Sequence, residues 1–88
     1  MGILEVEDIN FYPNPSNGEF DLDFTLSNND ETTIRIVDLS GREIFKEDMG
    51  NFSGNAKKRI DISNNEQGVY FLQLIQGDKV LVKKIVIQ

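Results

Sequence analysis

The sequence predicts an all-β domain built as an antiparallel β-sandwich. Three observations support this fold class. Ile, Val, Phe, Tyr and Thr dominate the segments between turns, whereas alanine occurs only once, at position 56. Turn residues recur at short intervals, and no convincing amphipathic helix lies between them. The stretch from Glu19 to Leu26 alternates polar and apolar residues without a break, which indicates a strand with one buried and one exposed face.

Seven segments have the composition and length of short strands. Besides Glu19 to Leu26, they are residues 4–11, 32–39, 42–48, 56–62, 68–76 and 79–87. A helix near residues 42–49 is the alternative for one of them, but Ile44-Phe45 between Gly41 and Gly50 favours a strand. About seven short strands is the number expected of an immunoglobulin-like β-sandwich.

The turn after the first strand has recognisable chemistry. In Pro13-Asn14-Pro15-Ser16-Asn17-Gly18, the Asn14 side chain can cap a turn and Pro15 sets φ near about −65°. Gly18 can then leave the turn with a positive φ. We therefore expect a structural turn here, with no reactive group.

Two later turns are equally specific. In Asp38-Leu39-Ser40-Gly41, the Asp38 carboxylate can accept a hydrogen bond from the Ser40 amide, and Gly41 supplies the left-handed position. Gly77-Asp78 between two apolar segments fits a two-residue hairpin turn. These residues are again expected to shape the backbone.

The hairpin closed by that last turn is unusual, because both of its faces are mostly apolar. The turn places Tyr70 opposite Ile85, and Lys83 and Lys84 interrupt the two faces. A sandwich strand covered on one face is expected to be polar on the other. Two interpretations remain: a bulge or an N-terminal covering segment hides the second face, or the ribbon is an exposed docking surface for another protein.

The net charge of −6 hides an asymmetry. The first 34 residues carry eight acids and no base, whereas the remainder carries nine bases and seven acids, which gives −8 and +2. The last ten residues contain Lys79, Lys83 and Lys84 and no acid. Three lysines are too few for a nucleic-acid site, so no such partner is expected. Lysines on an edge strand also hinder aggregation, and an unpaired final strand can pair with a second copy.

Composition argues against catalysis. The chain has no Cys and no His, which removes disulfides, thiol nucleophiles, Cys/His zinc sites and Ser-His-Asp triads. Calcium is the conceivable metal, since four carboxylates lie close together in the expected fold: Asp21, Asp23, Asp38 and Asp61. The sequence lacks an Asp-x-Asp-x-Asp-Gly loop, so a solvated acidic face is expected, with no cofactor. No apolar run has the length of a membrane span, so membrane insertion is not expected.

Four motifs occur in order along the chain: Phe11-Tyr12-Pro13-Asn14-Pro15 with Gly18, Asp38-Leu39-Ser40-Gly41-Arg42, Gly68-Val69-Tyr70-Phe71-Leu72 with Gly77, and a Lys-containing final strand. Together they resemble the type A C-terminal sorting domain of the type IX (Por) secretion system. The resemblance covers residues 10–88. Residues 1–9 are then an N-terminal strand or a linker remnant from an upstream passenger.

The resemblance implies a non-enzymatic sorting signal with an immunoglobulin-like fold, at the C-terminal end of a larger exported protein of a Gram-negative bacterium. Its implied partners are the passenger, the type IX translocon, and outer-membrane receptor or sortase proteins. The passenger would cross the periplasm and the outer membrane, the domain would be removed by a sortase, and the cargo would be released or anchored at the cell surface. No passenger and no secretory signal peptide are visible in the sequence, so the chain is expected to be an excised domain of a longer precursor.

By position, the resemblance marks two sets of residues. The turns and the later strand carry Pro13, Asn14, Pro15, Gly18, Asp38, Gly41, Gly68, Tyr70 and Gly77. The terminal sorting-signal strand carries Lys83, Lys84, Ile85, Val86, Ile87 and Gln88. The alternative function is an immunoglobulin-like accessory module that binds a cell-surface polysaccharide or protein, although the lack of Trp and the two Tyr disfavour stacking on sugars.

Overall fold

The computed structural model describes residues 2–4, 6 and 8–88, and these residues form strands and no helix. The strands are β1 (Gly2–Ile3), β2 (Asp8–Tyr12), β3 (Glu19–Val37), β4 (Glu43–Asp61), β5 (Gly68–Gln76) and β6 (Lys79–Ile87). They form one sheet in the order β1-β6-β5-β3-β2, and β4 pairs with β3. Every pairing is antiparallel except that of β1 with β6. None of the described residues belongs to a helix long and apolar enough to span a membrane.

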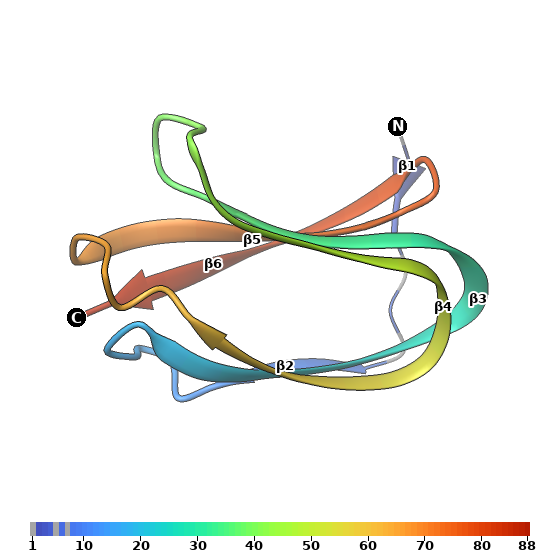
Figure 1. Cartoon of the computed structure of the whole chain (residues 1–88), viewed down its shortest axis with the longest axis horizontal. Coiled ribbons are helices and arrows are strands. Elements are labelled where there is room, and N and C mark those ends of the chain that lie inside the picture. The colour runs from blue at the N-terminus through green and yellow to red at the C-terminus, as the bar shows by residue number, and fades with distance from the viewer. Residues whose placement is uncertain (1, 5, 7) are drawn as a thin grey trace.

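The sheet curls over itself because β3 and β4 are long strands that bend together (Figure 1). The first half of β3 pairs with β2 in one layer, and its second half pairs with β5 in the other. The hairpin of β3 and β4 continues through the bend, where the register shifts between Leu26 and Asp30. Figure 1 shows the two resulting layers, with the bend at the right.

The expected seven-strand immunoglobulin-like sandwich is not confirmed. The segments expected at 19–26 and 32–39 are parts of the single strand β3, and those at 42–48 and 56–62 are parts of β4. The polar residues between them look like loops in the sequence, but Asp30 to Thr32 still pair with Gly50 to Phe52. Bulges and glycines with positive φ, such as Gly50 and Gly54, let a paired backbone bend without ending. Of the segment expected near residues 4–11, residues 8–11 belong to β2, and the prediction for Glu5 and Glu7 lies outside the described residues.

The core lies between the two layers. The alternation in residues 19–26 is confirmed, since every second side chain of that segment is buried. Facing positions of the other layer close the core. The fully buried large side chains are Phe20, Leu22, Phe24, Leu26, Ile34, Ile36, Ile60, Leu72, Leu74 and Ile85. Burial of these apolar surfaces is the main stabilising term of the fold.

A buried amide stabilises the bend. Gln76, only 5 % exposed, donates from Nε2 to the carbonyl oxygens of Asn28 at 2.8 Å and Phe52 at 3.0 Å. The same nitrogen lies 3.3 Å from the Thr32 hydroxyl. A buried amide without partners would destabilise the protein, so these bonds satisfy the Gln76 side chain and attach the bend to β5.

The final hairpin forms in the expected register. Tyr70 faces Ile85, Gln76 faces Lys79, and Gly77 has a φ of 59°. The pairing has no register shift, so a bulge does not explain its two apolar faces. β1 covers only the first residues of β6, at Lys79 and Val80.

Candidate functional site

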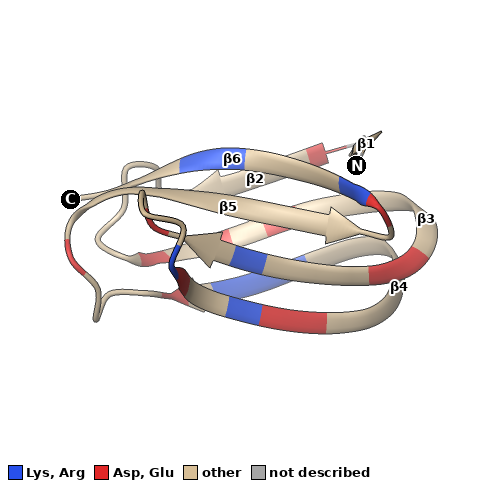
Figure 2. Cartoon of the chain, turned by 90° about the horizontal axis from the view of Figure 1, so that it is seen from above, with Lys and Arg blue, Asp and Glu red and all other residues tan. Residues whose placement is uncertain are grey.

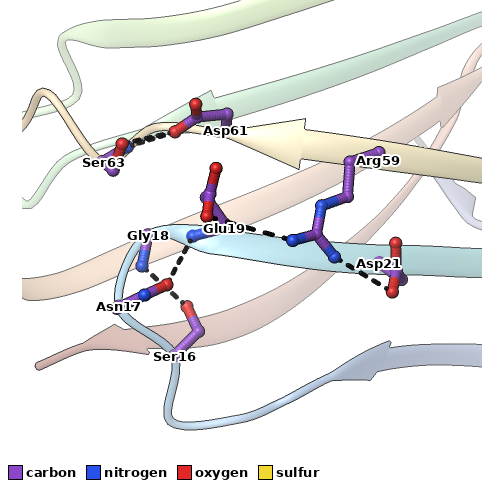
Figure 3. Close-up of polar contacts among 8 residues, drawn as sticks. All are labelled: Ser16, Asn17, Gly18, Glu19, Asp21, Arg59, Asp61 and Ser63. Carbon is purple, nitrogen blue, oxygen red and sulfur yellow. Dashed lines mark hydrogen bonds and ion pairs between the residues drawn. The ribbon is translucent and has the colours of Figure 1, made fainter.

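The Pro13–Gly18 turn has an exposed tip and a buried base. Pro13, Asn14 and Pro15 are exposed, whereas Ser16 and Gly18 are buried. The expected cap by Asn14 is not found among the described residues. Instead, the Ser16 hydroxyl accepts from the Gly18 amide at 3.2 Å, and the Asn17 side chain accepts from the Glu19 amide at 3.1 Å (Figure 3).

Gly18 has the expected positive φ, at 105°. The structure also places it against the loop that follows β4. A Cβ at this position would lie 2.6 Å from the Ser63 Cα, closer than any side chain tolerates. In addition, the Ile62 amide donates to the Gly18 carbonyl at 2.8 Å. The glycine is therefore required for both the backbone conformation and the close approach of two loops.

The same turn holds the C-terminal end of the chain. The Ser16 amide donates to the Val86 carbonyl at 3.1 Å, and the Gln88 amide donates to the Ser16 carbonyl at 2.8 Å. These bonds form a parallel bridge between Ser16 and Ile87. Sequence reasoning did not identify Ser16, because its partners are distant in the chain and its own residue type has no distinctive signal. The first and last motifs are thus in direct contact.

The Asp38–Gly41 turn forms as expected. Asp38 Oδ1 accepts from the Ser40 amide at 3.0 Å, from the Ser40 hydroxyl at 2.7 Å and from the Arg42 amide at 2.9 Å. The Ser40 hydroxyl, together with these amides and the Arg42 charge, holds the pKa of Asp38 below its ordinary value against the opposing effect of burial. Gly41 has a φ of 87°. The carboxylate thus has a structural role in closing the turn.

The other carboxylates considered for calcium are also engaged. Asp21 accepts from Arg59 at 3.2 Å, and Asp23 accepts from Asn55 at 2.8 Å. Asp61 accepts from the Ser63 hydroxyl at 2.6 Å, and mainly this bond lowers the pKa of Asp61 (Figure 3). Within the described part of the chain, no three acidic side chains converge on a possible metal.

Three motif positions meet at one end of the molecule. The turn at Asp38 and the segment that includes Gly68 and Tyr70 line an open hollow of about 270 Å³. The Tyr70 hydroxyl donates to the Glu66 carbonyl, four residues upstream, as in the tyrosine corners of β-sandwich proteins. Gly77 lies at the opposite end of β5, so the motif positions do not form one cluster.

The terminal strand combines buried and exposed positions. Ile85 and Ile87 are 1 % and 3 % exposed and belong to the core. Lys83, Lys84 and Gln88 are exposed, and Val86 is half-buried. The six residues marked by the resemblance therefore do not form one continuous surface.

The outer side of β6 is open between two attached ends. The Val80 carbonyl accepts from the Leu4 amide at 3.0 Å, and the Val86 carbonyl accepts from the Ser16 amide at 3.1 Å. Backbone groups alternate sides along a strand, so Val82 and Lys84 direct their N–H and C=O groups to that same outer side. No strand in the described part of the chain pairs there. We call the outer side of residues 81–85 the open edge.

The open edge is basic and partly apolar. Val82 is 48 % exposed, and Lys83 and Lys84 are exposed beside it. Among the described residues, neither lysine has an acidic partner within ion-pair distance, and neither does Lys79. Figure 2 shows these basic positions along β6, away from the paired charges of β3 and β4. The arrangement is suited to binding another chain.

A family model described as the secretion system C-terminal sorting domain matches residues 10–88. The matched segment includes all four motifs and the open edge. No curated protein matches the chain.

Proposed function

Because the chain belongs to the family of type IX secretion system C-terminal sorting domains, we propose that it directs an upstream passenger protein across the outer membrane. The family consists of sorting signals and is not an enzyme family. A signal of this kind implies export to the cell surface or the extracellular space. The match over residues 10–88 is the observation that carries the proposal.

The finer steps are part of the same proposal. The precursor would pass through the periplasm and reach the type IX translocon with this domain folded. A sortase would then remove the domain, and the cargo would be released or attached at the surface. Residues 1–9 would be the remnant of the connection to the passenger. The absence of cysteine suits a domain that waits in an oxidising compartment.

In this proposal, the terminal residues 83–88 contribute in two ways. Ile85 and Ile87 keep the strand in the core, because they are almost fully buried. Lys83 and Lys84 are the exposed cations that an export partner can contact, which favours steering by charge. The motif turns serve recognition indirectly, since the turn at Ser16 holds the end of β6 in place.

A reporter fusion tests the function. A periplasmic reporter carrying this chain at its C-terminus is expected to leave the cell in a host with type IX machinery. The same reporter without the chain, or in a strain that lacks the translocon, is expected to stay in the periplasm. Mass spectrometry of the exported reporter then shows whether the domain is removed. A folded fusion that stays inside the cell contradicts the proposal.

The alternative, an accessory module for a surface polysaccharide or protein, has a different signature. It requires binding by the isolated domain on a glycan array or to surface proteins, whatever its position in a chain. Export of the reporter with no such binding supports the sorting signal alone.

A further inference from the structure

The open edge offers a short length of unpaired backbone. The outward groups at its centre belong to Val82 and Lys84, and the two attached ends lie at the Val80 and Val86 carbonyls. At about 3.3 Å per residue, the six steps from residue 80 to residue 86 span roughly 20 Å. A segment of about four to six extended residues can therefore lie between Leu4 and Ser16 and bond to β6.

A second copy of this chain does not suit the open edge. Antiparallel pairing of two β6 strands about Lys83 would set the two Lys83 side chains directly opposite each other, which is destabilising. It would also bring residue 80 of one copy opposite residue 86 of the other. The bonds to Leu4 and Ser16 already occupy these positions. The attached ends thus protect the edge against self-pairing while leaving its centre available.

The charge of the edge defines the partner further. Lys83 lies on the core side of β6 and Lys84 on the outer side, since Lys83 pairs with the buried Leu72 and Lys84 with the half-buried Phe71. Cations therefore flank both faces of an added strand. The outer face on which Val82 lies also carries half-buried apolar side chains, namely Val69, Phe71, Ile75, Val80 and Val86. An added strand would gain from acidic side chains on both faces and from an apolar side chain beside Val82.

We infer that the open edge of β6 binds a short, extended, acidic segment of the export machinery by β-strand addition. This inference rests on the proposed function for the origin of the partner. The segment bonds to the N–H and C=O groups of Val82 and Lys84, and its carboxylates pair with Lys83 and Lys84. Recognition then requires the folded domain, and it is centred on Val82 to Lys84, upstream of the buried Ile85 and Ile87.

A proline substitution separates backbone pairing from other roles of the strand. Val82→Pro removes the outward N–H but no bond to β5, because the Val82 amide faces away from β5. Val82→Thr keeps the N–H and the β-branched shape, so it is the matched control. Both variants are first compared with the wild type by thermal melting. In the reporter fusion, Val82→Pro is expected to lower the exported fraction at least tenfold relative to Val82→Thr.

Charge reversal gives a second test that leaves the backbone unchanged. The double variant Lys83→Glu/Lys84→Glu alters two exposed side chains, and the fold is expected to remain intact. Export is expected to fall at least tenfold, whereas Lys79→Glu, outside the open edge, is expected to export like the wild type. A photo-crosslinking residue at position 82 then identifies the bound segment by mass spectrometry.

The outcomes distinguish the two proposals. A wild-type fusion that is not exported contradicts the proposed function. Equal export by Val82→Pro and Val82→Thr, or undiminished export by the charge-reversed variant, overturns the edge inference and leaves the function standing. A crosslink to another copy of this chain, or to a segment without acidic residues, also overturns it.

Discussion

Deletion of residues 83–88 is expected to unfold the domain, and not only to remove a signal. The deletion takes Ile85 and Ile87 out of the core, where they are 1 % and 3 % exposed. Burial of one such side chain contributes roughly 1.5–3 kcal/mol, so the two together contribute about 3–6 kcal/mol. The deletion also removes both backbone bonds to Ser16. A small domain has a total stability of about 5–15 kcal/mol, and 88 residues place this one toward the low end.

Thermal melting followed by circular dichroism measures this effect. The truncated chain is expected to show no cooperative transition, and Ile85→Ala alone is expected to lose about 2–5 kcal/mol. Lys83→Gln/Lys84→Gln is the matched control, because it changes the same strand without touching the core, and it is expected to melt like the wild type. A truncated chain that melts cooperatively within a few degrees of the wild type would refute the reasoning. Lost export after truncation could then be assigned to recognition.

Three further predictions concern the turns and the bend. Gly18→Ala is expected to lower the unfolding free energy by more than about 2 kcal/mol, because the added Cβ clashes with Ser63 at a position of positive φ. Gly41→Ala has open space around it and is expected to lower the unfolding free energy by only about 1–2 kcal/mol. Urea denaturation measures both losses, and equal losses would contradict the contact between Gly18 and Ser63. Gln76→Leu removes the donor of two hydrogen bonds to backbone carbonyls at the bend, so it is expected to lower the unfolding free energy by about 1–3 kcal/mol in the same assay. An unchanged midpoint would exclude a role for the amide. The lowered pKa values of Asp38 and Asp61 mean that their contribution to stability is present above about pH 4 and is lost as the pH falls through the lower pKa of the folded state. The double variant Asp38→Asn/Asp61→Asn is therefore expected to show a smaller drop in unfolding free energy between pH 5 and 2 than the wild type, and an identical drop would contradict this.

The parts of the structure that depend on neighbouring residues could be predicted from the sequence. The turn at Gly77 determines the pairing of Tyr70 with Ile85, because a two-residue turn allows only one register. The Asp38 cap and the positive φ of Gly18 and Gly41 could be predicted because they depend only on residue types within each turn. The Asp38 and Gly77 turns, which are part of the motifs that carried the family resemblance, are among these locally determined features.

The parts that depend on distant residues could not be predicted. The curl of β3 and β4 passes through a polar segment near Asp30 that has every sequence feature of a loop. It remains paired because the strand opposite continues and Gln76 bonds to the backbone beside the bend. The contact of Ser16 with the chain end and the parallel pairing of β1 with β6 likewise require the finished fold. The attachment of Val86 and Gln88 to Ser16, at the end of the sorting-signal strand, could not be predicted for the same reason.

The charge asymmetry of the sequence has a structural explanation. Most bases of the second part of the chain pair with acids in the structure: Arg59 with Glu19 and Asp21, Lys57 with Asp23, Lys58 with Glu47, Arg35 with Glu43 and Arg42 with Asp38. Four lysines of the described chain have no ion pair, and three of them, Lys79, Lys83 and Lys84, lie on β6. An exposed surface ion pair contributes little to stability, so leaving these three lysines without one costs the fold little. The positive charges of Lys83 and Lys84 are therefore available to an acidic partner at the open edge, whereas Lys79 lies outside it.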